Sequence, residues 1–226
     1  MVRPLHIVWD WNGTLLDDLD IVVESLNVGT ARFGVPSIDH DGYRDHFTRP
    51  VRGFYDSLFG RPISDMEWDE LNKSFHDEYY ARVERATLTL GARDAIDRVV
   101  ELGWSQSLLS MSIHDHLLEI VSSHGIADRF VSVDGIRSNT GGLKADHLAT
   151  HLESLQKEPT TVLLIGDTPD DAMAARGVGA GIVLYDGGSH HLDVLHALGA
   201  PVAYSLGDAL DLAVRLAEGE TLEAGV

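Results

Sequence analysis

The chain has 226 residues and a net charge of −19, from 17 Lys and Arg residues against 36 Asp and Glu residues. This length suits one α/β domain with a smaller attachment. No basic run interrupts the acidity, so we expect no binding to nucleic acid or to an anionic membrane. Cysteine is absent, which excludes disulfides and thiolate metal sites and fits a reducing compartment.

The apolar segments are short throughout the chain. The stretch before Asp10 is too short for the core of a signal peptide, and no window approaches the length of a membrane span. We therefore expect a cytoplasmic protein. Its expected oligomeric state is a monomer or a homodimer.

Short apolar runs that end in Gly, Asp or Ser alternate with segments of helical period. The runs predict strands at residues 5–9, 107–110, 130–133, 162–165, 181–185 and 201–204. The intervening segments predict helices at residues 92–102, 113–124, 144–155, 169–176, 190–198 and 208–216. Strands that nearly lack charge are buried on both faces, as in parallel sheets. The pattern therefore predicts an α/β fold with a doubly wound, Rossmann-like parallel sheet.

The spacing of the strands breaks once. A βαβ unit takes about 30 residues, yet the second predicted strand begins far beyond that distance from the first. Residues 16–89 therefore form a predicted insertion, and residues 1–15 and 90–226 form the core. Within the insertion, Ser64 and Glu67 match a capping box, and apolar residues then recur at spacings of three and four. We expect a small α-helical cap.

Two features with catalytic potential follow the first two predicted strands, at the edge where open α/β sheets bind ligands. The first strand delivers Asp10 into the turn at residues 10–14, whose sequence is Asp-Trp-Asn-Gly-Thr. The second strand ends in a hydroxyl, that of Ser110. Each feature alone is a weak signal.

Two further features lie later in the chain. Lys144 follows Gly141 and Gly142 at the start of a predicted helix, where it opposes the positive end of the helix dipole, so a negative group is expected opposite. Residues 166–171 read Gly-Asp-Thr-Pro-Asp-Asp after a buried strand. Helix capping accounts for one of these carboxylates. Three would repel one another without a cation, and hard divalent cations prefer such oxygen ligands.

Taken together and in this order, the four features resemble the haloacid dehalogenase superfamily. Residues 10–14 are similar to its nucleophile motif, usually D-x-D-G-T, and residues 166–171 to its G-D-x-x-x-D metal motif. Ser110 and Lys144 match its second-strand hydroxyl and its lysine. The helical insertion is similar to the type 1 cap of phosphoglycolate phosphatase-like members.

The resemblance implies Mg²⁺-dependent hydrolysis of a small phosphomonoester, such as phosphoglycolate or a sugar phosphate. Asp10 would attack phosphorus and form an aspartyl-phosphate. The implied metal ligands are Asp10, the backbone carbonyl of Asn12, Asp167 and Asp171. The implied contacts to the phosphate group come from Thr14, Ser110 and Lys144.

Position 12 departs from the family pattern, which places there the Asp that protonates the leaving alcohol. Asn12 cannot transfer a proton, and general acid–base catalysis is typically worth 10² to 10⁴ in rate. Asn12 is therefore a natural variation in a phosphatase, a mark of different chemistry, or a substitution that traps the intermediate. Different chemistry includes a phosphomutase and a phosphonatase, for which Lys73 is the only lysine in the insertion. A non-enzymatic alternative is a protein that binds a phosphorylated metabolite and has lost turnover.

The substrate's leaving group would face the cap. Arg49 and Arg52 are the candidate ligands there, because guanidinium groups recognise carboxylates and phosphates; the alternative is two surface arginines in a turn. Trp11 either lines the cleft between cap and core or packs in the core.

Overall fold

The computed structural model describes residues 5–137 and 143–220. Six strands form a parallel sheet in the order β5-β4-β1-β6-β7-β8. These strands are β1 (His6–Trp9), β4 (Ser105–Ile113), β5 (Val133–Ile136), β6 (Val162–Gly166), β7 (Gly181–Tyr185) and β8 (Val202–Ala203). The order reverses at β1, so the doubly wound fold predicted from the sequence is confirmed, and the edge above β1 is where such sheets bind ligands.

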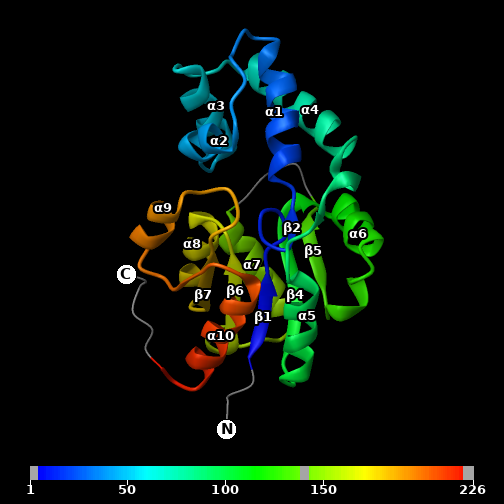
Figure 1. Cartoon of the computed structure of the whole chain (residues 1–226), viewed down its shortest axis with the longest axis vertical. Helices are drawn as coiled ribbons and strands as arrows, with labels where there is room; N and C mark the ends of the chain where they lie inside the picture. The colour runs from blue at the N-terminus through cyan, green and yellow to red at the C-terminus, as the bar shows by residue number, and fades with distance from the viewer. Residues whose placement is uncertain (1–4, 138–142, 221–226) are drawn as a thin grey trace.

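Helices cover both faces of the sheet (Figure 1). One hydrophobic cluster joins the sheet to α5 (Ala92–Glu101), α6 (His114–Ser123) and α10 (Leu206–Ala217). A second cluster, on the other face, joins it to α7 (Lys144–Ser154), α8 (Pro169–Val178) and α9 (Leu192–Ala197). Short 3₁₀ turns precede β5 and β6 at Ala127–Arg129 and Pro159–Thr161.

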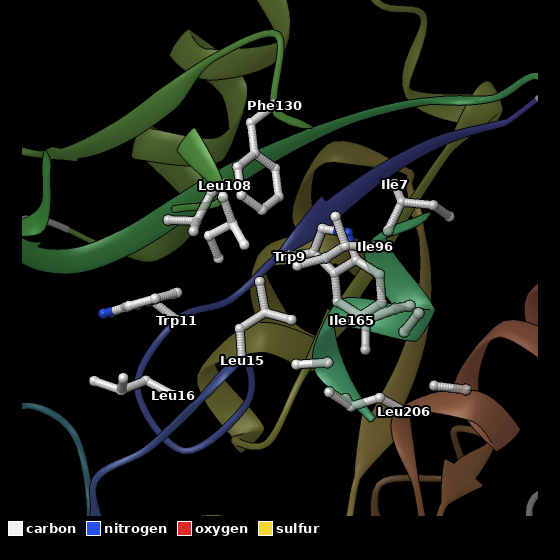
Figure 2. Packing of buried hydrophobic residues seen from close by; sticks show 14 of the residues in the cluster. Ile7, Trp9, Trp11, Leu15, Leu16, Ile96, Leu108, Phe130, Ile165 and Leu206 are labelled. Carbon is white, nitrogen blue, oxygen red and sulfur yellow. The ribbon is translucent and has the colours of Figure 1, made fainter. Parts of the chain in front are cut away.

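The core is packed around β1, whose four residues are all buried. Figure 2 shows Trp9 and Ile165 from neighbouring strands among aliphatic side chains. Trp11 lies in this cluster with 1% of its surface exposed, which decides between its two sequence interpretations in favour of packing. Trp11 thereby anchors the turn that carries the acidic motif.

The inserted segment forms four helices, which we call the cap. They are α1 (Leu19–Ala31), α2 (His40–His46), α3 (Val51–Phe59) and α4 (Asp65–Tyr80), followed by a 3₁₀ turn at Val83–Arg85. The predicted capping box at Ser64 and Glu67 is present at the start of α4. The cap has its own hydrophobic cluster, which includes Leu26, Phe54 and Leu71. In Figure 1 the cap helices lie above the carboxyl end of β1.

Three details differ from the sequence prediction. The strand predicted at residues 107–110 does not end at Ser110 but continues to Ile113, which pairs with Ile136 of β5. The chain enters and leaves the cap through two antiparallel strands, β2 (Leu16–Asp17) and β3 (Thr87–Leu88), which are too short to give a periodic signal. The strand predicted at residues 130–133 is β5, which begins only at Val133. The predicted strand ends too early because Asp134 and Gly135 resemble a turn, whereas both lie within β5, where Asp134 pairs with Leu109 of β4.

No helix within the described residues is long and apolar enough to cross a membrane.

Candidate active site

The sheet brings three of the sequence motifs to one edge. Trp9 pairs with Leu108 of β4 and with Ile165 of β6, so β1 lies between these two strands. Asp10 follows β1 directly, and its backbone N–H donates to the carbonyl of Ile165 at 2.9 Å. This register therefore sets the turn at residue 10 beside Ser110, which lies within β4, and beside the turn that follows β6.

Lys144 joins two of the acidic residues. Its Nζ lies 2.5 Å from a carboxylate oxygen of Asp10 and 2.5 Å from one of Asp171. Lys144 is only 4% exposed. Burial alone would lower its pKa, but the two carboxylates raise the pKa above its usual value. The negative group predicted opposite Lys144 is thus a pair of carboxylates; the preceding Gly141 and Gly142 lie outside the described residues.

Asp167 completes the acidic cluster and is fully buried. One carboxylate oxygen accepts from the Thr14 hydroxyl at 3.1 Å, and the other accepts from the Ser189 backbone N–H at 2.8 Å. Glycines let it fit: a Cβ on Gly13, where φ is +71°, would lie 2.7 Å from the carboxylate, and one on Gly188 would lie 2.0 Å from it. The loops after β1 and β7 therefore close around this carboxylate.

The donor set fits a hard divalent cation. Oxygen atoms of Asp10, Asp167 and Asp171 lie within 4.8 Å of one another, and all three residues are buried. Lys144 balances only one of the three carboxylates. Burial raises the pKa of Asp10 well above its ordinary value, and burial together with the Asp171 carboxylate raises the pKa of Asp167 to about 6. A bound cation would relieve this repulsion, and buried carboxylate oxygens are the ligands that Mg²⁺ takes.

Asp170 does not belong to this cluster. Its carboxylate lies 3.7 Å from Nε of Arg49 in the cap, so two of the three carboxylates after β6 join the acidic cluster and the third reaches the cap. The sequence analysis expected Asp167, Asp170 and Asp171 to share one cation, and this was wrong for Asp170.

Asn12 is held by four polar side chains. Its amide nitrogen donates to Asp18 and to the Tyr79 hydroxyl, both at 2.7 Å. Its amide oxygen accepts from the hydroxyls of Ser112, at 2.7 Å, and Ser110, at 3.3 Å. Tyr79 also donates to Asp18 at 2.6 Å. Ionised Asp18 can only accept a hydrogen bond, so it needs the amide nitrogen as a donor. The two serine hydroxyls can donate to the amide oxygen. The network therefore favours Asn over Asp at position 12.

A cavity of about 260 Å³ lies between the cap and the core. The core supplies Asp10, Asn12, Ser110 and Lys144 to its lining, and the cap supplies Arg49. The structure thus brings five of the predicted site residues together around one space.

Two residues predicted to contact substrate do not line this cavity. Thr14 is completely buried behind Asp167, to which it donates. Arg52 pairs with Asp65 at 2.7 Å and donates to the carbonyl of Ile63. Lys73, the lysine considered for phosphonate chemistry, is 76% exposed and pairs with Asp77; it does not line the cavity either.

Sequence reasoning missed three residues of the Asn12 network. Ser112 was detectable, since side chains two positions apart on a strand share a face with Ser110. Asp18 and Tyr79 gave no such signal, because only the folded cap brings Tyr79, from the end of α4, beside the turn after β1.

The fold and the acidic cluster place the chain in a known class. The family model for haloacid dehalogenase-like hydrolases matches residues 7–184, and the chain belongs to this family.

Curated relatives of similar length carry more specific names. A phosphoglycolate phosphatase from Vibrio vulnificus is 26% identical over 91% of this chain and 94% of its own length. One from Mesorhizobium japonicum is 25% identical over 83% of this chain and 85% of its own. Among solved structures, a predicted phosphatase from Clostridium acetobutylicum has the same fold, with a TM-score of 0.83 at 16% identity over 95% of this chain and 100% of its own.

Proposed function

We propose that this chain is a Mg²⁺-dependent phosphatase that hydrolyses a small phosphomonoester through an aspartyl-phosphate on Asp10. The observation that carries the proposal is the ion pair between Asp10 and Lys144, in a buried cluster with Asp167 and Asp171, where Asp10 and Lys144 both line the cavity. The curated relatives named phosphoglycolate phosphatase support hydrolysis of a phosphate ester. We further propose residues 16–89 as the cap domain and residues 1–15 and 90–226 as the core.

Asp10 would act as the nucleophile. Lys144 holds its Oδ1, and we assign the attack on phosphorus to Oδ2. The new bond forms as the ester P–O bond breaks, and the electron pair stays on the leaving oxygen. Water then hydrolyses the acyl phosphate, which regenerates the carboxylate and releases inorganic phosphate. The Lys144 ammonium and the Ser110 hydroxyl, which both face the cavity, would bind phosphoryl oxygens.

Asp10, Asp167 and the backbone carbonyl of Asn12 would hold Mg²⁺, with Asp171 beside them. When bound, the ion supplies positive charge that offsets the negative charge of the phosphoryl group.

Asn12 sets the limit on turnover. Its amide donates to Asp18 and Tyr79 and cannot give a proton to the leaving oxygen. Alcohols that need a proton to leave should therefore be released slowly. The hydrogen-bond partners of the amide suit Asn, which supports Asn as the native residue at this position rather than as a replacement for a catalytic Asp.

The proposal is tested by phosphate release from p-nitrophenyl phosphate in the presence of Mg²⁺. The nitrophenolate needs no proton to leave, so we expect the wild type to be active and Asp10→Asn to fall to background. Asn12→Asp completes the set. If the wild type releases no more phosphate than Asp10→Asn while Asn12→Asp is active, the native chain is not a phosphatase.

A further inference from the structure

The cap wall of the cavity is built mainly from aromatic side chains. Its aromatic residues include Phe47, Phe54, Tyr55, Trp68, Phe75 and Tyr79. The rings touch one another: the centroids of Phe54 and Tyr55 are 5.3 Å apart, and those of Tyr55 and Trp68 are 6.0 Å apart. These edge-to-face contacts are the arrangement that aromatic rings prefer. Phe75 and Tyr79 form a second stacked pair, with centroids 5.6 Å apart. The cap side of the cavity therefore presents aromatic surface to a space that Asp10 also lines.

Cations that could receive a second anionic group are scarce in this cavity. Among the described lining residues, the arginine and lysine side chains are Arg49 and Lys144. Lys144 is engaged by Asp10 and Asp171, and Arg49 faces Asp170. The Nδ1 of His76 donates to the carbonyl of Asn72 in its own helix. A leaving group with a carboxylate, such as glycolate, would lose its hydration against this wall, and that is unfavourable. Arg49, the cap arginine that lines the cavity, already has a carboxylate 3.7 Å from its Nε.

The size of the cavity and the chemistry at position 12 both favour an aromatic leaving group. The volume of about 260 Å³ is slightly below the usual range for ligand sites, and suits a leaving group with one or two rings. Asn12 supplies no proton to the leaving oxygen. A phenol leaves as a comparatively stable phenolate, whereas an aliphatic alcohol leaves as a strongly basic alkoxide.

Resting on the phosphatase function proposed above, we infer that the substrate is an aryl phosphate, the monoester of a phenol-class aromatic alcohol. The ring would pack against the cap wall, and the phosphate would lie between Asp10, Ser110 and Lys144. The ester bond would break onto the phenolic oxygen, and solvent water would later protonate the phenolate.

Recognition of the ring is tested without turnover by two inhibitors that differ only in the group of interest. Benzylphosphonate and phosphonoacetate each carry one methylene between the phosphonate and either a phenyl ring or a carboxylate. With Mg²⁺ present, calorimetry should give a Kd at least tenfold lower for benzylphosphonate. Equal binding, or tighter binding of phosphonoacetate, would overturn the inference even in a protein that hydrolyses nothing.

Turnover supplies the second comparison. Benzyl phosphate and 2-phosphoglycolate release unactivated alcohols and differ only in phenyl against carboxylate. We expect kcat/KM to be at least tenfold higher for benzyl phosphate, and higher again by at least tenfold for phenyl phosphate. Phosphoglycolate turned over as well as benzyl phosphate would overturn recognition of the ring, and equal values for benzyl and phenyl phosphate would overturn the phenolic assignment. Hydrolysis of none of the three, with benzylphosphonate still preferred, would instead count against the phosphatase function alone.

A charge placed on the cap wall should reverse the preference. Asn72 is exposed on α4 and lines the cavity, one helical turn from Trp68, and Arg is a better helix former than Asn. In Asn72→Arg, the ratio of benzylphosphonate to phosphonoacetate affinity should fall at least fivefold. Met66→Arg is the matched control, because Met66 lies on the same helix, is 77% exposed and does not line the cavity. An unchanged ratio in Asn72→Arg would contradict the placement of the ring on this wall.

Discussion

The amide nitrogen of Asn12 lies 2.7 Å from a carboxylate oxygen of Asp18. Asp18 is 2% exposed and also accepts from the Gly13 backbone N–H at 3.0 Å. Burial raises the pKa of Asp18, and the hydrogen bonds from Tyr79 and Asn12 oppose that shift. The turn after β1 is therefore stabilised by an amide donor at position 12, where a carboxylate would meet another carboxylate.

Asn12→Asp should consequently destabilise the fold, although it restores the usual family residue. The substitution removes a donor from a buried carboxylate, and we expect a loss of about 1–3 kcal/mol in the free energy of unfolding. Urea denaturation at neutral pH with EDTA measures it.

The double variant Asn12→Asp/Asp18→Asn is the control for this explanation, because it exchanges the donor and the acceptor. It should recover at least half of the loss. If Asn12→Asp is as stable as the wild type, or if the second substitution adds a further loss, the contact does not determine the residue at position 12.

Binding of Mg²⁺ should stabilise the folded protein. The three buried carboxylates repel one another without a cation, so Mg²⁺ should raise the thermal midpoint, by an amount equivalent to about 2.7 kcal/mol at 100 times Kd. Asp167→Asn removes one charge from the cluster. We expect this variant to be as stable as the wild type in EDTA, or more stable, and to show little response to Mg²⁺.

Calorimetric melting of both proteins in EDTA and in Mg²⁺ makes that comparison. An equal rise on Mg²⁺ addition in both proteins would place the ion outside the Asp10, Asp167 and Asp171 cluster.

Gly188 should be required for the site and not for the fold as a whole. A Cβ there would lie 2.0 Å from Oδ2 of Asp167, so Gly188→Ala must displace the carboxylate or its loop. We expect at least a tenfold weaker Mg²⁺ affinity by titration calorimetry.

Gly207→Ala is the matched glycine control. A Cβ on Gly207, within α10, would meet only the Ser205 hydroxyl, at 3.6 Å, and Ala is favoured over Gly in helices. This control should bind Mg²⁺ as the wild type does. Wild-type affinity in Gly188→Ala would show that Asp167 is not a ligand.

The sequence predicted the core because its signals are local. Apolar runs without charge identify buried parallel strands, and the residues that follow them meet at one edge, as Asp10 after β1 and Asp167 after β6 do. The motifs predicted the acidic cluster, and the break in strand spacing predicted the inserted segment.

The surroundings of Asn12 and the lining of the cavity depend on contacts between cap and core. Tyr79 is 61 positions from Asp18, and no periodicity relates them. The apolar stripe of α4 predicted that a face is buried, but packing decides which of its rings faces the cavity. Likewise, the turn at Arg49 and Arg52 looked basic, while its partners, Asp170 and Asp65, are set by the tertiary fold.

A chain of hydrogen bonds that links β1, β4, α7 and β5 should make the free energy of unfolding depend on pH. His6 contacts the hydroxyls of Ser105 and Ser107, both at 2.8 Å, and Ser107 contacts His151 at 2.7 Å. His151 in turn contacts Asp134 at 2.7 Å. Burial, and to a lesser degree Lys157 and His151, lowers the pKa of His6 to about 3.

The sign follows from the unfolded state, in which a histidine has a pKa of about 6.5. Below that value the unfolded chain binds a proton at His6, whereas the folded chain stays neutral there. The contribution of neutral His6 to stability is therefore complete above about pH 6.5 and falls as the pH drops toward about 3. At pH 5.5 the loss is about 1.4 kcal/mol relative to pH 8. His6→Gln keeps a hydrogen-bonding side chain and does not titrate. Urea denaturation at both pH values should therefore show a smaller loss on acidification in His6→Gln than in the wild type, by about that amount. Because Asp10 and Asp167 titrate in both proteins, the difference isolates His6, and parallel losses would show that His6 is protonated in the folded chain.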